Sequence, residues 1–158
     1  MSMGDLYDTD VLLWSEHQAG LLRRRAAGEL VNEAELDWPN IAEEIESLGT
    51  SERSRLRSHI GTVIEHLIKL QASPAIDPRN GWRASIRNAR REIKRALKDS
   101  PSLRPAVAQL IADETPDAGE DAAAAMADYG EKPRVEVGSL NFTQDQVLGD
   151  WFPDDPLQ

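Results

Sequence analysis

Three histidines and two glutamates are the residues of this sequence whose types suggest a metal or acid–base site. Glu52, His59 and His66 lie seven residues apart, so on a continuous helix they share one side. Seven residues also span about 10.5 Å of helix axis, which is too far for two ligands of one ion. A site would need ligands from several helices, and the candidates are then His17, Glu44, His59 and His66.

The same histidines have an ordinary structural interpretation. None of them has an Asp, Glu or His three or four residues away, which is the spacing that metal-binding helices use. We therefore expect them to lie at the edge of a core, hydrogen-bonded to the backbone or to a carboxylate. A metal site between helices is the alternative.

Glu43, Glu44 and Glu46 form a group of carboxylates that general acid–base chemistry could use. Such chemistry needs a carboxylate held in a cleft beside its partner. Neighbouring residues of a helix diverge by about 100°, so at most one of the three faces a core, and Glu44 is the best placed. Because a carboxylate at a packed interface needs a partner, we expect Glu44 to pair with Arg83 or Arg87.

A run of basic residues between positions 83 and 98 could bind phosphate, since guanidinium groups form paired hydrogen bonds with phosphate oxygens. Only Trp82 is aromatic there, and 5% aromatic residues are few for a surface that stacks bases. We expect carboxylates of the same fold to neutralise most of this charge, with nucleic-acid binding as the alternative. The candidates for anion or nucleic-acid contacts are Arg83, Arg87, Arg90, Arg91, Lys94 and Arg95.

Other signatures of catalysis are absent from the sequence. It has no Gly-rich phosphate loop followed by Lys and Ser or Thr, no G-x-G-x-x-G, no G-x-S-x-G and no H-E-x-x-H. The lack of cysteine excludes a disulfide framework, a thiolate zinc site and a cysteine nucleophile. These absences favour a non-enzymatic role. We therefore predict no catalytic residue, and the cofactor, if there is one, is unknown.

The composition is that of one soluble globular domain. The chain has 158 residues, of which 40% are hydrophobic and 29% charged. No apolar run approaches the ~20 residues of a membrane helix, and the first residues lack the features of a signal peptide, so we expect a cytoplasmic protein without membrane contact. The net charge of −10 argues against a dedicated binder of duplex DNA.

The charge is divided unevenly along the chain. Residues 1–48 carry a net charge of −8, residues 49–98 carry +8, and residues 99–158 carry −10. Such blocks either neutralise one another within the fold or face a partner of opposite charge.

The spacing of apolar residues predicts helices throughout, so the elements that position these side chains are α-helical. The second helix carries Ile41, Ile45 and Leu48 and resumes in phase at Leu56, which favours one continuous helix across Gly49. We expect Trp151 and Phe152 to pack back onto the bundle. The predicted helices are residues 9–27, 37–72, 80–98, 100–130 with a kink or restart at 115–116, and 143–149, with an irregular loop over 130–142.

Several strings of residues recur in order and spacing in one known family. They are Tyr7–Asp10, Ile41–Gly49, His66–Lys69, Trp82–Arg87, Arg90–Ile93, Asp99–Leu103 and Trp151–Pro153. Over residues 7–153 the chain resembles domain-of-unknown-function family twenty-nine, a group of bacterial proteins, and departs from it at Pro116 and in the polar 130–140 loop. The resemblance implies an all-helical bundle and supplies no activity, cofactor or catalytic residue.

The sequence thus predicts an all-α, up-and-down bundle of four main helices plus a short C-terminal helix, as a single domain over residues 1–158. The function we expect first is a non-enzymatic protein-interaction module that binds a protein partner or itself. One alternative is a nucleic-acid-associated protein that uses the arginine-rich third helix. The other is a metal- or small-ligand-binding bundle that uses His17, Glu44, His59 and His66.

Overall fold

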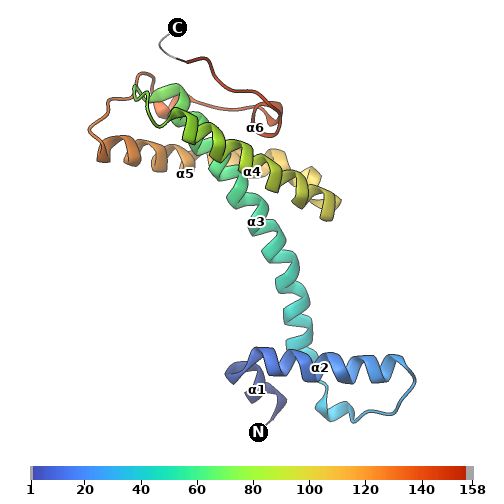
Figure 1. The fold of residues 1–158 in the computed structure, drawn as a ribbon. Coiled ribbons are helices and arrows are strands. Elements are labelled where there is room, and N and C mark those ends of the chain that lie inside the picture. Colours follow the sequence, from blue (N-terminus) through green and yellow to red (C-terminus); the bar gives the residue numbers. More distant parts are fainter. Residues whose placement is uncertain (1, 156–158) are drawn as a thin grey trace. The chain divides into compact units, whose positions relative to one another are not determined.

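The computed structural model describes residues 2–155 of the chain, and these residues are all-α. The chain is 77% helical, and no β-strand occurs in the described part. The predicted fold class is therefore confirmed. The helices are α1 (Met3–Thr9), α2 (Val11–Ala26), α3 (Trp38–Ala72), α4 (Arg79–Asp99), α5 (Val107–Asp128) and α6 (Gln144–Leu148), as Figure 1 shows.

The sequence analysis missed α1 because its seven residues bury no side chain and so show no apolar period. A capping box between Ser2 and Asp5 begins this helix. Helix α2 then starts later than predicted, because its N-cap is Asp10, whose carboxylate accepts a hydrogen bond from the amide of Leu13 at 3.0 Å. Gly28, with φ of 85°, follows its C-terminal end as predicted.

Helix α3 is continuous over 35 residues and passes through Gly49 without interruption, as predicted. Asp37 precedes it, and its carbonyl accepts the amide of Ile41 at 2.9 Å, which closes the first turn. The helix ends at Ala72, just before Pro74, whose ring disfavours a helical conformation for the preceding residue.

Of the kink or restart predicted at Thr115–Pro116, the restart is wrong. Helix α5 is unbroken from Val107 to Asp128, and the Thr115 hydroxyl donates to the carbonyl of Ile111 at 2.6 Å instead of capping a new helix. The helix starts later than predicted because Pro101–Ala106 form a 3₁₀ segment. Gly130, with φ of 68°, follows its last turn.

The C-terminal segment agrees with the sequence analysis. Thr143 and Gln146 form the capping box that begins α6. Residues 130–142 are irregular apart from the 3₁₀ turn Val137–Ser139. Trp151 and Phe152 pack against the core, as expected.

The described residues divide into two compact units, one ending at Ser51 and the other beginning at Glu52. We call them the N-terminal unit and the C-terminal unit; α3 contributes residues to both. The assignment of residues 1–158 to a single domain stays a prediction.

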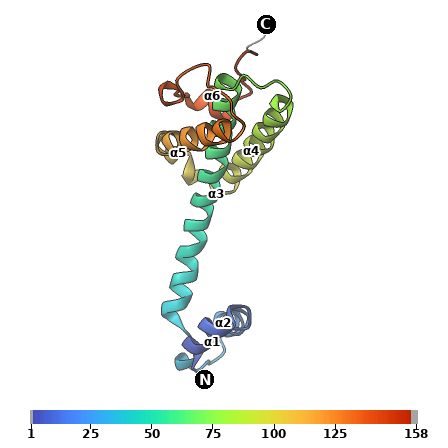
Figure 2. The same ribbon diagram turned by 90° about the vertical axis from the view of Figure 1, so that its left-hand side faces the viewer.

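The C-terminal unit holds the large apolar core. Figures 1 and 2 show α4 and α5 packed beside the C-terminal part of α3. Trp82 is only partly buried against this core, whereas the apolar residues further along the same side of α4 are buried. They are Ile86, Ala89, Ile93 and Leu97. The core side chains with at most 2% exposure are Leu56, Ile60, Val63, Ile64, Leu67, Ile68, Leu70 and Ala72 of α3, Ile86, Ile93 and Ala96 of α4, Val107, Leu110, Ala122 and Met126 of α5, and Val147 of α6.

The N-terminal unit has a much smaller core, centred on Trp14 of α2. The indole Nε1 of Trp14 donates to the carboxylate of Asp37 at 3.0 Å, and the Tyr7 ring meets the indole edge-on at 4.8 Å between centroids. Gln18 is buried and uses both ends of its amide, donating to the carbonyl of Glu35 at 2.9 Å and accepting from the amide of Asp37 at 2.8 Å. Polar bonds thus hold the α2–α3 link in place.

None of the described helices is both long and apolar enough to cross a membrane.

Candidate functional site

Helix α4 carries the predicted basic residues. Residues 146–155, which we call the C-terminal segment, contact one side of this helix. Arg79 donates from Nε to the carboxylate of Asp155 at 2.8 Å, and Arg83 donates to the same oxygen. The hydrogen bond from Arg79, followed by that from Arg83, holds the pKa of Asp155 below its usual value of 3.8, against the opposing effect of desolvation. Arg79 also donates to the carbonyls of Ser73 and Leu70, at the end of α3.

Arg90 is the most deeply engaged of the predicted candidates. Its side chain is buried, and it donates to the carbonyls of Val147, Gln146 and Trp151 at 2.6 to 3.0 Å. Its guanidinium carbon also lies 4.9 Å from the centroid of the Phe152 ring. Burial lowers the pKa of Arg90, but a guanidinium remains protonated at any physiological pH.

Arg87 lies over the same Phe152 ring at 5.5 Å, so two guanidiniums contact one aromatic side chain. Carboxylates of the fold therefore neutralise only part of the positive charge on this side of α4. Asp155 binds Arg79 and Arg83, whereas Arg90 donates to backbone carbonyls from Nε and Nη2 and Arg87 lies over an aromatic ring.

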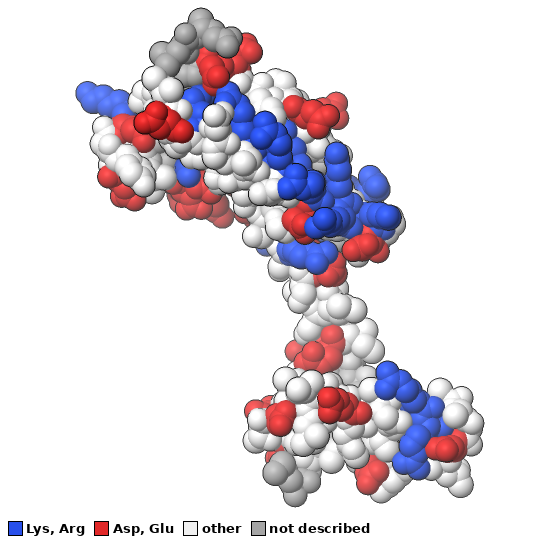
Figure 3. Space-filling model, in the orientation of Figure 1, with Lys and Arg blue, Asp and Glu red and all other residues white. Residues whose placement is uncertain are grey.

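The remaining predicted bases face solvent. Arg95 pairs with Glu92 at 2.6 Å within α4, and Arg91 donates to the side chain of Asn88. Lys94 is exposed and has no salt bridge among residues 2–155. Figure 3 shows the resulting band of Lys and Arg side chains along α4.

Two cavities flank this band, and Arg91 lines both. The first, of about 360 Å³, lies toward the C-terminal segment and is lined by Arg87, Arg90, Arg91, Lys94, Asp150 and Phe152. The second, of about 430 Å³, lies toward α3 and is lined by His59, Thr62, Ser85, Asn88, Ala89, Arg91, Glu92 and Arg95. The structure thus brings the predicted candidate His59 beside two predicted arginines.

The other histidines have separate surroundings. His17 is exposed on α2, and the Nδ1 atom of His66 lies 2.8 Å from the carbonyl of Thr62 on its own helix. This backbone contact is the ordinary role that the sequence analysis expected. In the described part of the chain, no three side chains of His, Cys, Asp or Glu gather where they could hold a metal ion.

Glu44 has a different partner from the one predicted. The phenol of Tyr7 donates to its carboxylate at 2.6 Å, whereas Arg83 binds Asp155 and Arg87 lies over Phe152. The hydrogen bond to Glu44 is the main cause that raises the pKa of Tyr7 to about 12. Sequence periodicity could not reveal this pair, because Tyr7 lies on α1, the helix that it missed.

The N-terminal unit exposes several large apolar side chains. Ile45 and Leu48 of α3 are each 67% exposed, so the apolar side of the helix predicted over 37–72 is not buried at this end. The physical reason is that the small core around Trp14 leaves no element to cover this side of α3. The exposed large apolar residues of this unit are Val11, Leu12, Leu13, Leu30, Trp38, Ile45 and Leu48.

The exposed side chains of Trp38, Ile45 and Leu48, with the partly buried Ile41 between them, form a stripe on α3. At about 100° per residue, Trp38, Ile41, Ile45 and Leu48 fall within an arc of about 80°. We call these four residues the α3 stripe. Acidic residues border it on both sides, Asp37 and Glu44 on one and Glu46 on the other.

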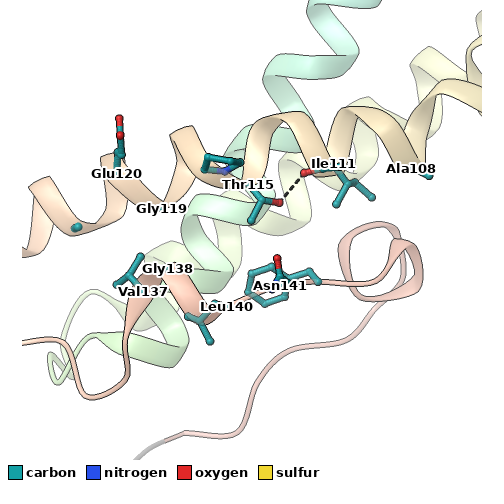
Figure 4. Close-up of a pocket in the computed structure, with 13 residues that line it drawn as sticks. Ala108, Ile111, Thr115, Gly119, Glu120, Val137, Gly138, Leu140 and Asn141 are labelled. Atoms are coloured by element: carbon teal, nitrogen blue, oxygen red, sulfur yellow. Dashed lines mark hydrogen bonds between the residues drawn. The ribbon is translucent and has the colours of Figure 1, made fainter.

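A third hollow, a groove of about 660 Å³, lies between α5 and the 137–142 segment. Figure 4 shows Ile111 and Thr115 of α5 with their connecting hydrogen bond, and Val137, Leu140 and Asn141 opposite. Small residues such as Ala112 and Gly119 line the helix side. The polar side chains of the groove are Thr115, Glu120 and Asn141, and the Thr115 hydroxyl is bound to the carbonyl of Ile111.

Sequence reasoning expected Phe152 to pack onto the bundle, but it missed the two carboxylates of the C-terminal segment that complete the basic site. Asp150 lines the cavity beside α4 and Asp155 binds Arg79 and Arg83, each from more than 50 positions away in the sequence, and no periodic pattern links these carboxylates to α4. Arg79 was missed because the predicted helix began one residue later, at Asn80.

Comparison with known proteins gives one result. A family model described as "Domain of unknown function DUF29" matches residues 6–152. Neither the curated proteins nor the solved structures include a match to this chain.

Proposed function

Since the chain belongs to the family Domain of unknown function DUF29, whose description assigns no activity, we propose that it is a non-enzymatic protein-interaction module. Its N-terminal unit binds an amphipathic helix with basic flanks, supplied by a partner protein. The observation that supports this proposal is the exposed, acid-bordered α3 stripe.

The apolar content of the stripe supports a binding role. Ile45 and Leu48 together leave two large aliphatic side chains mostly in water, with Trp38 beside them. Large contiguous apolar surface is uncommon on a monomer and is typical of interaction sites. The 3-4-3 spacing from Trp38 to Leu48 is also the spacing with which one helix meets another.

The charge around the stripe supports the choice of partner. Residues 1–48 contain eleven acids and three arginines. Two of those arginines are already paired, Arg24 with Glu29 and Arg25 with Glu33. A second acidic surface of this kind would be repelled, whereas lysines or arginines flanking a partner helix would face the acids along both edges of the stripe.

A pair of synthetic helices tests the proposal. One peptide carries leucines at helix-contact spacing with lysine flanks, and the other has glutamate at every lysine position. Fluorescence anisotropy with the full-length protein should show binding of the lysine peptide only, weakening as salt rises. The double variant Ile45→Ser/Leu48→Ser should lose most of that binding, because both contact side chains are removed.

Leu30→Ser is the matched control, since Leu30 is 96% exposed but lies outside the α3 stripe. It should bind the lysine peptide like the unmodified protein. Equal binding of both peptides, or binding unaffected by the double variant, contradicts the proposal. Self-association seen by sedimentation and lost in the double variant would make a second copy of this chain the occupant, which also overturns the choice of a foreign basic helix.

Nucleic-acid association is a second candidate, favoured by the exposure of Arg91, Lys94 and Arg95 on α4. It predicts binding to mixed-sequence DNA or RNA at low salt, with an affinity that falls steeply as salt rises. A lack of binding at low salt would contradict nucleic-acid association.

The metal hypothesis for His17, Glu44, His59 and His66 stays a prediction, which elemental analysis of protein purified without chelator would test.

A further inference from the structure

We infer that the cavity between α4 and the C-terminal segment is a binding site for a phosphoryl group, formed by Arg87, Arg90, Arg91 and Lys94. This site lies wholly within the C-terminal unit and is independent of the proposed partner surface on the N-terminal unit. The four bases follow the spacing i, i+3, i+4 and i+7, so a single helix presents them on one side.

Arg90 gives the site a fixed, buried positive charge. Its side chain is 5% exposed, and three backbone carbonyls hold its Nε and one terminal nitrogen. Among residues 2–155, the other terminal nitrogen, Nη1, makes no hydrogen bond to the protein. Nη1 is not one of the buried unpartnered atoms of the described chain, so solvent or an anion can reach this donor, and charge-assisted hydrogen bonds from a guanidinium to an anion are strong.

The remaining cations are available to a ligand. None of Arg87, Arg91 and Lys94 forms a salt bridge within the described residues. Among residues 2–155, Asp150 is the one carboxylate that lines the cavity, so four described bases face one described acid. The site therefore has an excess of positive charge even though the whole chain is acidic.

The geometry favours a compact phosphoryl ligand over stacked bases. The Phe152 ring is already covered by the guanidiniums of Arg87 and Arg90, at 5.5 and 4.9 Å from its centroid. These two guanidiniums leave less of the ring for stacking on a nucleobase. A cavity of about 360 Å³ is at the small end of the range for ligand sites and holds one or two phosphoryl groups.

Adjacent residues of α4 provide the decisive control. Lys94 lines this cavity, whereas Arg95 lines the cavity on the α3 side. Isothermal titration calorimetry of the full chain with sodium pyrophosphate at low ionic strength should show binding. Lys94→Gln should weaken it about tenfold, by the loss of one charge-assisted hydrogen bond, while Arg95→Gln should leave it unchanged.

Asp150→Asn should tighten pyrophosphate binding by about two- to fivefold, because it removes the one carboxylate that the described residues contribute to the cavity. An improved affinity cannot come from a misfolded protein, so this variant guards against a merely structural effect of Lys94→Gln. Circular dichroism of each variant checks that the helices are intact.

A mixed-sequence single-stranded RNA identifies the source of the phosphoryl group. RNA binding that pyrophosphate displaces and Lys94→Gln weakens supports the site and makes a polymer backbone the source. Pyrophosphate binding without RNA binding supports the site with a small phosphorylated molecule as the source. Absence of pyrophosphate binding, or binding equally sensitive to Lys94→Gln and Arg95→Gln, overturns the inference.

Discussion

Helix α3 has the same helical spacing of apolar residues in both units, but these side chains are exposed in one unit and buried in the other. In the N-terminal unit, Ile45 and Leu48 are mostly exposed, whereas Ile60 and Leu67 in the C-terminal unit are fully buried. Both lengths belong to one uninterrupted helix and have the same periodicity. Amphipathic spacing therefore determines which side of a helix is apolar, but a neighbouring element must exist before that side becomes a core.

The contrast between the two lengths of α3 should be clearest in stability. Leu67→Ala should lower the free energy of unfolding by about 2–5 kcal/mol, because it leaves a cavity in a closely packed core. Leu48→Ala should change it by no more than about 0.5 kcal/mol, since water already surrounds the side chain. Urea denaturation followed by circular dichroism measures both. Equal losses of unfolding free energy in the two variants would show that the α3 stripe is covered in solution.

Helix α4 shows the same contrast between buried and exposed positions for two neighbouring arginines, Arg90 and Arg91. Arg90→Gln should cost about 1.5–3 kcal/mol of unfolding free energy, because the carbonyls of Val147, Gln146 and Trp151 lose a charged donor. Arg91→Gln should stay within about 0.5 kcal/mol, since Arg91 is exposed. Thermal unfolding of the two variants side by side tests this. A larger loss for Arg91 would place it, rather than Arg90, against the C-terminal segment.

Alkaline titration tests the polar contacts beside the exposed stripe. Because the pKa of Tyr7 is raised from 10.0 to about 12, its hydrogen bond to Glu44 should stabilise the fold fully below pH 10.0 and be lost as the pH rises through about 12. In a Tyr129→Phe background, only Tyr7 contributes tyrosinate absorbance, and its midpoint should lie near 12. Adding Glu44→Gln should move that midpoint down. A midpoint at 10.0 with Glu44 intact would show that the bond does not form.

Acid titration gives the smallest expected effect, at the end of the C-terminal unit. The lowered pKa of Asp155 means that its bonds to Arg79 and Arg83 stabilise the fold above pH 3.8 and are lost as the pH falls through the lower, folded-state value. Asp155→Asn should therefore be slightly less stable than the parent at pH 6 and equal to it at pH 2. Asp154→Asn, at the exposed neighbour, should match the parent at both. A deficit that persists at pH 2 would point to packing instead of charge.

Helix class, order and most boundaries could be predicted from the sequence because they depend on neighbours along the chain. The continuity of α3 through Gly49 and the capping box at Thr143 are local properties of this kind. The failures have local reasons as well. Pro116 suggested a new helix start, but a proline whose missing amide falls within a longer packed helix can be tolerated there.

The candidate site was predictable only in its residue types. The sequence shows that bases recur along α4, but which of them are covered depends on residues 146–155, which reach them through the fold. The partners of Arg79, Arg83 and Arg90 come from that segment, and the partner of Glu44 comes from α1. Contacts between positions so distant in sequence leave no periodic signal.

Pro116 also changes what the α5 groove offers to anything that enters it. Proline has no amide proton, so the carbonyl of Ala112 lacks the donor that each ordinary helical turn supplies four residues on. Ala112 and Pro116 both line the groove. The wall of the groove therefore has a backbone hydrogen-bond acceptor in addition to the side-chain oxygens of Glu120 and Asn141, and a molecule with an N–H or O–H group placed opposite that carbonyl could donate to it.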